Sequence, residues 1–333
     1  MPVAVWLALH SGIGALGTWI ARRYALRARL IDQPGERRSH AAATPRGGGA
    51  AIVAAMLVAV AVAIATDLQN AVLPAAFAIG LLLVAGIGAV DDHRPLSPWL
   101  RLGVHAVAAA LLAGGFWAAY GDPWLALGAF ALAIGLTNVW NFMDGIDGLA
   151  ASQAALFAAA VAVWLHGPAQ WLALALGAAC CGFLPFNFPR AKIFLGDVGS
   201  GALGYAVAAL CLALAAEARP GWGLSLLPLA AFLVDAALTL VGRMLRGERW
   251  WTPHVTHAYQ IWARKGGHVR VTLLYGLWTA IGIALWWSFR AENAVFITMV
   301  LLAWYTLSGL IWRGLRRESG LAVVGGGISK DQE

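Results

Sequence analysis

The sequence predicts an all-α integral membrane protein with about eleven transmembrane helices, which form one polytopic domain over residues 1–333. Hydrophobic residues make up 61% of the chain, charged residues make up only 12%, and the mean hydropathy is +0.73. Such a chain holds more apolar surface than a single water-soluble core can bury. Apolar runs of about 20 residues, the length that crosses a hydrocarbon core of about 30 Å, follow one another along it.

The expected spans alternate with polar connections, and the seventh span is short. They cover residues 3–20, 48–66, 71–90, 103–120, 124–140, 149–165, 170–185, 199–216, 224–242, 271–289 and 294–311. No small-residue cleavage site follows the first span, so we expect it to be retained and not removed as a signal peptide.

The distribution of Lys and Arg predicts the orientation. Alternating spans place the connections 21–47, 91–102, 141–148, 186–198 and 243–270 on one side, together with a polar tail over 312–333. All Lys and Arg residues except Arg219 and Arg290 then lie on that side. The positive-inside rule makes this side cytoplasmic, with the N-terminus periplasmic and the C-terminus cytoplasmic. This asymmetry explains the net charge of +7, so no nucleic-acid partner is expected.

Acidic residues gather at the expected cytoplasmic ends of the spans. They are Asp91 and Asp92 in "GAVDDHRP", Asp144 and Asp147 in "NFMDGIDG", and Asp197 in "FLGDVGSG". An even number of spans separates each cluster from the next, so the chain returns to the same face each time. Ionised side chains beside hydrocarbon are costly and often functional, and we expect these groups to converge on one site.

A structural role remains open for each cluster. Pro95 and Pro98 mark a turn, in which Asp91 and Asp92 would be solvated. Asp147 and Asp197 each stand where the N-cap of a following helix is expected.

The residues beside the aspartates favour a ligand site. Gly145 and Gly148 remove side-chain bulk next to the first pair. Near Asp197, Lys192 and several glycines bring together a cation, a hard oxygen ligand and accessible amides, as a phosphate group with Mg²⁺ requires.

Two further features lie at or near the same face. Asp235 interrupts an apolar helix, and Arg243 follows about two turns later on roughly the same face, so a structural ion pair remains open. The connection 243–270 interleaves basic, aromatic and imidazole groups. His254 and His257 lack a third zinc ligand at the usual spacing, so anion binding fits them better than zinc. Trp250 and Trp251 would anchor this loop at the membrane interface.

Five segments together resemble the signature stretches of the polyprenyl-phosphate N-acetylhexosamine-1-phosphate transferases, glycosyltransferase family 4. They are "DQPGERRSHAAATPRGGGAAIV", "GAVDDHRPLSPWLR", "NFMDGIDGLA", "FNFPRAKIFLGDVGSGALG" and "VTHAYQIWARKGGHVRVTLLYG". The "HAYQ" and "SH…TPRGGG" wording is similar to the O-antigen-initiating branch that uses UDP-activated deoxy-N-acetylhexosamines. It is less similar to the peptidoglycan branch, which carries a run of histidines at the position of the "HAYQ" stretch.

The resemblance implies a multi-pass enzyme of the bacterial inner membrane with a cytoplasmic active site. Undecaprenyl phosphate would attack the β-phosphorus of a UDP-N-acetylhexosamine, giving undecaprenyl-diphospho-sugar and UMP and initiating O-antigen or related polysaccharide synthesis. The implied cofactor is Mg²⁺, with Mn²⁺ as the alternative ion. The partners are the two substrates and the lipid bilayer, and Gly-rich and Ala-rich helix faces permit a homodimer.

The resemblance also assigns roles to individual residues. The catalytic residues would be Asp91, Asp92, Asp144 and Asp147, the metal ligands Asp197 and Asp92, and the substrate-binding residues Arg46, Arg101, Asn141, Asn187, Lys192, His254 and His257. Arg101 stands where relatives often carry Lys, and His105 where Gln is common. An Arg still neutralises phosphate, but its planar fork changes the geometry.

Two other classes of protein share parts of this pattern. An intramembrane prenyltransferase also uses Asp-rich Mg²⁺ sites, but it needs fewer helices and a second acidic motif, which the sequence lacks. A secondary transporter would place its ionisable residues at mid-membrane between inverted repeats. Here they border one edge of the membrane.

Overall fold

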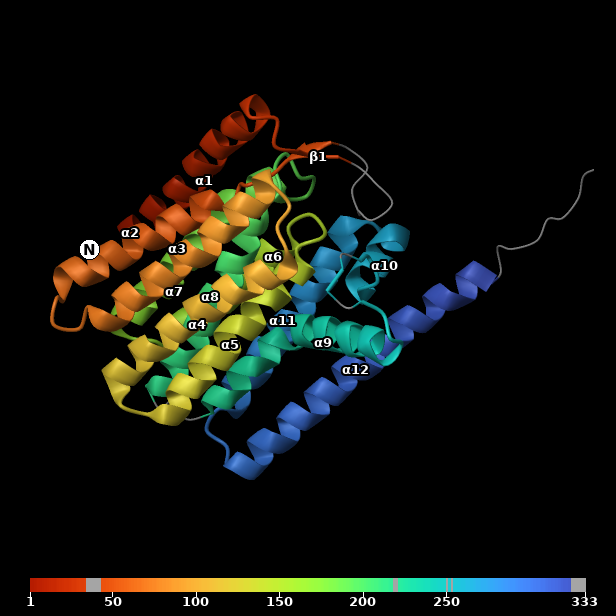
Figure 1. Cartoon of the computed structure of the whole chain (residues 1–333). Coiled ribbons are helices and arrows are strands. Elements are labelled where there is room, and N and C mark those ends of the chain that lie inside the picture. The colour runs from red at the N-terminus through yellow and green to blue at the C-terminus, as the bar shows by residue number, and fades with distance from the viewer. Residues whose placement is uncertain (34–42, 218–220, 250, 253, 325–333) are drawn as a thin grey trace, which may run out of the picture.

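The computed structural model describes residues 1–33, 43–217, 221–249, 251–252 and 254–324, and these fold almost wholly into helices (Figure 1). The N-terminal half contains α1 (Val3–Arg27), β1 (Ile31–Asp32), β2 (Thr44–Pro45), α2 (Ala50–Thr66), α3 (Val72–His93), α4 (Pro98–Tyr120), α5 (Pro123–Met143) and α6 (Leu149–Ala162). The C-terminal half contains α7 (Gly167–Asn187), α8 (Asp197–Ala216), the 3-10 helix η1 (Trp222–Leu229), α9 (Ala230–Leu245), α10 (Ala258–Gly266), α11 (His268–Phe289) and α12 (Ala294–Val324).

The expected apolar spans all correspond to helices. Within the described residues, nine helical segments are long and apolar enough to cross a membrane, with η1 and α9 together counting as one segment. Two further apolar helices are shorter, α2 with 17 residues and α6 with 14. The seventh span was expected to be short, but α7 extends over 21 residues. The periplasmic position of the N-terminus stays a prediction.

Three local features differ from the sequence expectations. Pro98 is the first residue of α4 and not part of the preceding loop, since its fixed φ and missing N–H suit the first helical position. Helix α12 continues to Val324, so part of the expected polar tail is helical. Strands β1 and β2 form a short antiparallel pair in the otherwise all-α fold. Residues 34–42, Arg219, Trp250 and residues 325–333, on which some expectations fell, lie outside the described residues.

Helix α8 occupies the centre of the bundle, where it packs against α3 and α5. Its apolar window is 89% buried, whereas that of α12 is only 11% buried, and α12 runs along the outside of the bundle (Figure 1). Small residues permit the close packing: a Cβ at Gly88 of α3 would collide with the backbone carbonyl of Asp197, and one at Gly204 with that of Leu136. The N-terminus of α8 is therefore held firmly between its neighbours.

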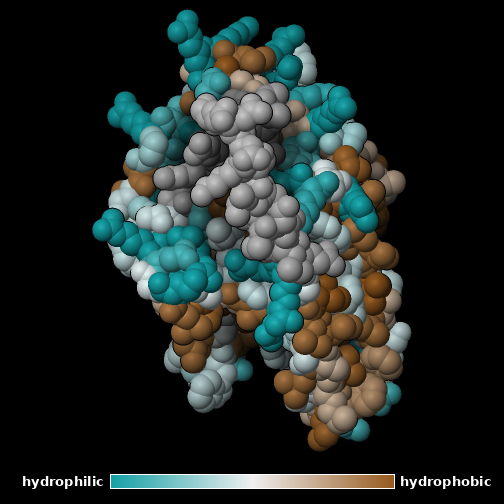
Figure 2. Space-filling view, turned by 90° about the vertical axis from the view of Figure 1, so that its right-hand side faces the viewer, coloured by the Kyte–Doolittle hydropathy of each residue, from teal (hydrophilic) through white to brown (hydrophobic). Residues whose placement is uncertain are grey.

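The surface separates into a polar end and an apolar body. Figure 2 shows hydrophilic side chains concentrated over the upper end of the molecule and hydrophobic side chains below them. In Figure 1 the strand β1 and helix α10 lie at this upper end. A helical bundle that is embedded in a bilayer exposes its apolar residues in this way.

Candidate active site

The predicted site residues meet at the polar end of the bundle, around the N-terminus of α8. Asp91 and Asp92 lie in the last turn of α3, Arg101 in the first turns of α4, and Asn141 in the last turn of α5. Asp197 is the first residue of α8. Clusters that are far apart in the sequence thus share one place, which the alternation of spans predicted.

Arg101 connects three of these groups. Its Nη1 lies 2.7 Å from an Asp91 carboxylate oxygen and 3.1 Å from Asp197 Oδ2, and its Nη2 donates to Asn141 Oδ1 at 2.9 Å. Asn141 Nδ2 in turn donates to Asp197 Oδ1 and to the Ser200 hydroxyl, each at 2.9 Å. One guanidinium therefore screens two adjacent carboxylates, and a planar fork suits this better than an ammonium group.

Asp92 fixes the start of α8. Its two oxygens accept the backbone N–H groups of Asp197 at 3.1 Å and Val198 at 3.2 Å. Its side chain is 3% exposed, and Arg46 Nε lies 3.7 Å away, while the Arg46 guanidinium also donates to the Asp92 carbonyl. A carboxylate at a helix N-terminus satisfies free N–H groups and interacts favourably with the helix dipole. Both oxygens are engaged within the protein.

Asp144 differs from its acidic neighbours. It follows the last residue of α5, and its carboxylate forms no hydrogen bond or ion pair with any described residue. Burial raises the pKa of Asp144 well above its ordinary value, and the nearby carboxylates of Asp197, Asp92 and Asp147 raise it further. This place in the protein therefore carries excess negative charge, which a bound cation would relieve.

Asp147 ties three segments together. One oxygen accepts the N–H of Ala191 at 3.3 Å, and the other lies 3.3 Å from His268 Nδ1 at the start of α11. The Asp147 carbonyl accepts the Thr272 hydroxyl at 2.8 Å. The expected N-cap bond to α6 is absent among the described residues, and Gly148, with φ +75°, precedes that helix instead.

Asn187 and Lys192 were both predicted to bind substrate, but their surroundings differ. Asn187 is 5% exposed, accepts the Gly148 N–H at 2.8 Å and donates to the Ile193 carbonyl at 3.0 Å. It thus holds the loop before α8 against the loop after α5. Lys192 is exposed, and among the described residues its Nζ reaches only the Pro185 carbonyl, at 3.5 Å. Lys192 therefore remains accessible to an anionic ligand.

The glycine-rich segment after β2 lies beside the loop that precedes α8. Gly48 and Gly49 donate their N–H groups to the carbonyls of Phe194 and Leu195, at 2.9 and 2.8 Å. A Cβ at Gly49 would collide with Gly199. These contacts place Arg46 next to Asp92.

Asp235 has a structural role, but its partner is not Arg243. Its oxygens accept the N–H groups of Ala258 and Tyr259 at 2.9 and 3.0 Å, so it caps α10. Further donors come from Thr239, Tyr275 and Trp312, on three different helices. Arg243 pairs instead with Glu248 at 2.9 Å. The first turn of α10 is therefore anchored to α9, α11 and α12 through one carboxylate.

We expect Asp235→Asn to lower the free energy of unfolding by about 2–3 kcal/mol, because an amide nitrogen would face buried donors. Thermal unfolding in detergent measures this loss. Trp312→Phe removes a single donor to the same carboxylate and should cost only about 1 kcal/mol. Equal stability of Asp235→Asn and the wild type would show that the carboxylate does not hold these helices together.

His254 and His257 lie next to the Asp235 carboxylate that caps α10. His257 is 3% exposed, its Nδ1 lies 3.5 Å from Asp235 Oδ1, and its ring stacks on His254 with 4.9 Å between centroids. Burial, together with the neighbouring His257 and Arg243, lowers the pKa of His254 to about 4. At neutral pH, His254 therefore offers a hydrogen-bonding imidazole and not the positive charge expected from the sequence.

Two residues at the site were missed. Ser200, one turn into α8, accepts from Asn141, and its only signal was its position in the run of glycines after Asp197. His268 contacts Asp147 from α11, and its place in "KGGHVR" carried no distinguishing pattern. Both depend on contacts between distant segments.

A carboxylate cluster with an asparagine and guanidinium groups, at the polar end of an apolar helical bundle, fits a membrane enzyme that handles phosphate groups. Comparison with known proteins specifies the class. The model of glycosyl transferase family 4 matches residues 73–215. The decaprenyl-phosphate N-acetylglucosaminephosphotransferase of Mycobacterium tuberculosis is 31% identical, over 87% of this chain and 83% of its own length. The chain belongs to glycosyl transferase family 4 and is a phosphoglycosyl transferase.

Other relatives carry names that specify different substrates. The undecaprenyl-phosphate alpha-N-acetylglucosaminyl 1-phosphate transferase of Yersinia pestis is 28% identical over 88% of this chain and 86% of its own length. A phospho-N-acetylmuramoyl-pentapeptide-transferase of Heliobacterium modesticaldum is 30% identical over 84% and 95%. None of these three names specifies a deoxy-sugar, so the expected deoxy-N-acetylhexosamine branch stays a prediction.

Proposed function

We propose that this protein transfers an N-acetylhexosamine-1-phosphate from its UDP-sugar to undecaprenyl phosphate, at the cytoplasmic face of a bacterial inner membrane. The products are undecaprenyl-diphospho-sugar and UMP, and the reaction would initiate O-antigen or a related surface polysaccharide. The observation that carries the proposal is the Asp144 carboxylate, which has no partner among the described residues and lies near the carboxylate of Asp197, which Arg101 contacts.

The residues present fit a Mg²⁺ ion that shares its coordination with substrate. Among the described residues, no three His, Cys, Asp or Glu side chains are grouped to hold a metal ion by themselves. Mg²⁺ usually keeps several waters and binds through one or two carboxylates plus substrate phosphates. We assign Asp144 and Asp197 as these carboxylates. When bound, the ion would neutralise charge on the diphosphate.

Asp92 has a different part in this proposal from the one that the sequence suggested. The resemblance implied a metal ligand, but both Asp92 oxygens accept N–H groups of α8. We assign Asp92 as a positioning residue that fixes Asp197. Asp91, the other aspartate of the pair, contacts Arg101 directly. Asp147, which holds α11 and the loop before α8, is assigned to positioning as well.

The chemistry asks the protein mainly to screen charge and to orient the reactants. An oxygen of the lipid phosphate attacks the β-phosphorus, the bond from that phosphorus to the bridging oxygen breaks, and UMP leaves with the electron pair. A phosphate monoester is largely ionised near neutral pH, so no strong base is needed. Arg101 and Arg46 border the carboxylates and Lys192 is accessible, so these three cations would hold the phosphate oxygens.

The sugar is the finer part of the proposal. Names of relatives support N-acetylglucosamine, and the "HAYQ" and "TPRGGG" stretches support a deoxy-N-acetylhexosamine. We expect purified protein with undecaprenyl phosphate to release UMP from one member of a panel of UDP-GlcNAc, UDP-GalNAc, UDP-FucNAc and UDP-QuiNAc. Discrimination should exceed about tenfold, because a site that binds a hydroxyl rejects a sugar that lacks it. A prenyltransferase or a transporter would release no UMP from any of them.

Removing divalent cations should stop the reaction. With EDTA present, we expect UMP release to fall by at least about a hundredfold, and Mg²⁺ or Mn²⁺ in excess should restore it. Ca²⁺ should restore much less, because its longer bonds and higher coordination number do not match two carboxylates and a diphosphate. Full activity in EDTA would exclude the metal assignment.

A further inference from the structure

A cavity lies at the end of the bundle opposite to the carboxylates. Its volume is about 450 Å³, within the range of about 300–1,000 Å³ that is usual for ligand sites. The first turns of α3, from Val72 to Phe77, border it, whereas Asp91 and Asp92 end the same helix. The last turns of α8 border it too, whereas Asp197 begins that helix.

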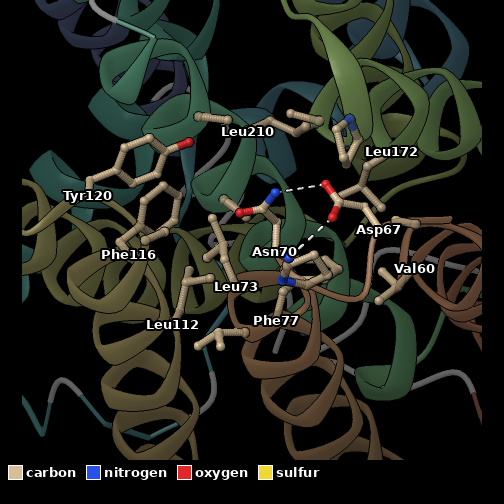
Figure 3. Close-up of a pocket in the computed structure, with 18 of the residues that line it drawn as sticks. Val60, Asp67, Asn70, Leu73, Phe77, Leu112, Phe116, Tyr120, Leu172 and Leu210 are labelled. Carbon is tan, nitrogen blue, oxygen red and sulfur yellow. Dashed lines mark hydrogen bonds between the residues drawn. The ribbon is translucent and has the colours of Figure 1, made fainter. Parts of the chain in front are cut away.

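The cavity has apolar walls and a polar mouth. Figure 3 shows Tyr120 and Phe116 on one side, Val60, Leu172 and Asp67 on the other, and Asn70 between them. The remaining polar lining residues are Gln69, His166 and Glu217. The apolar walls suit a hydrocarbon chain and the polar mouth suits a polar headgroup, so the cavity fits an amphiphilic ligand.

The mouth is acidic although the chain carries a net charge of +7. The Asp67 carboxylate accepts two hydrogen bonds from Asn70, one from its backbone N–H at 3.3 Å and one from its side-chain Nδ2 at 2.8 Å. Both donors are neutral. Glu217 adds a second carboxylate, which accepts the His166 N–H at 3.3 Å. No Lys or Arg occurs among the described residues that line the cavity, and none of the described cations forms an ion pair with Asp67.

Headgroup charge must therefore decide what occupies the cavity. A hydrocarbon chain gains little by moving from lipid into an apolar protein cavity, because both surroundings are equally apolar. Carboxylates at the mouth repel an anionic headgroup and attract an ammonium group. We propose that the cavity binds a membrane lipid with a primary ammonium headgroup, with the chain between α2, α4 and α8 and the ammonium group at Asp67. This inference does not depend on the proposed transferase reaction.

Native mass spectrometry of the full-length protein tests the proposal. The protein in detergent is titrated with phosphatidylethanolamine, with N-acetylated phosphatidylethanolamine, which lacks the ammonium charge, and with phosphatidylglycerol. We expect the first lipid to bind about three- to tenfold more tightly than the other two, the effect of one partly exposed ion pair. Soluble ethanolamine should not compete, because it has no chain.

Matched variants locate the site. Asp67→Asn keeps an oxygen that can accept from Asn70 but removes the charge, so the preference for phosphatidylethanolamine should disappear. Ala213→Phe fills the cavity from α8 and should weaken all three lipids at this site. Glu292→Gln removes an exposed carboxylate between α11 and α12 at the same end, outside the cavity, and should change nothing. Equal binding of the three lipids to the wild type, or an unchanged preference in Asp67→Asn, would overturn the proposal.

Discussion

Asp197→Asn should lower turnover by about a thousandfold while the protein still inserts and purifies normally. An amide oxygen can still accept from Asn141 Nδ2, so the start of α8 should keep its place. The amide has no negative charge, however, and it presents an N–H₂ group to Arg101 and to the proposed cation. UMP release in purified protein gives the rate, and thermal unfolding shows whether the fold is intact.

A matched control separates charge at the site from charge in general. Glu292→Gln removes a carboxylate at the end of the bundle opposite to Asp197 and should leave the rate unchanged. Wild-type turnover in Asp197→Asn would remove the metal assignment for this residue. A thousandfold loss accompanied by unfolding would instead assign Asp197 a structural role.

Arg101→Ala should lower turnover by about a hundredfold or more. The substitution leaves Asp91 and Asp197 side by side without their shared guanidinium, and breaking one partner of such a pair costs about 3–5 kcal/mol when the pair is buried. These side chains are 12–29% exposed, so solvent will screen part of that cost.

Arg101→Lys provides the graded comparison. It keeps the charge but cannot reach Asp91, Asp197 and Asn141 at once, so we expect a loss of about tenfold. KM for the UDP-sugar and kcat should be measured separately, because a residue that screens the reacting phosphates changes kcat. If Lys and Ala at this position behave alike, the bridging geometry matters and the charge alone does not.

The architecture could be predicted because a bilayer constrains it strongly. Apolar runs gave the positions of the helices, and the even number of spans between acidic clusters placed Asp91, Asp144 and Asp197 at one end of the bundle. The ends of helices were less certain: α12 continues past its apolar part, since the segment that contains Arg316 and Arg317 can stay helical outside hydrocarbon.

The roles of individual carboxylates could not be predicted in the same way. Asp92 caps α8 because Gly88 lets α3 approach the Asp197 backbone, and the sequence shows the glycine without showing which helix it faces. A structural pair between Asp235 and Arg243 on the same helix was left open, but the donors to Asp235 come from α10, α11 and α12 as well. Local periodicity describes neighbours along one helix, whereas these bonds depend on how separate helices pack.

The central claim is that Asp144 and Asp197 jointly bind a divalent cation at the place where the diphosphate lies. Anomalous scattering from Mn²⁺, in crystals of the protein grown with UDP, locates the ion directly. We predict one ion at about 2.1–2.2 Å from an oxygen of each of these two residues and in contact with a UDP phosphate. An ion bound to Asp91 or Asp92 alone, or a UDP molecule at another end of the bundle, would contradict the account.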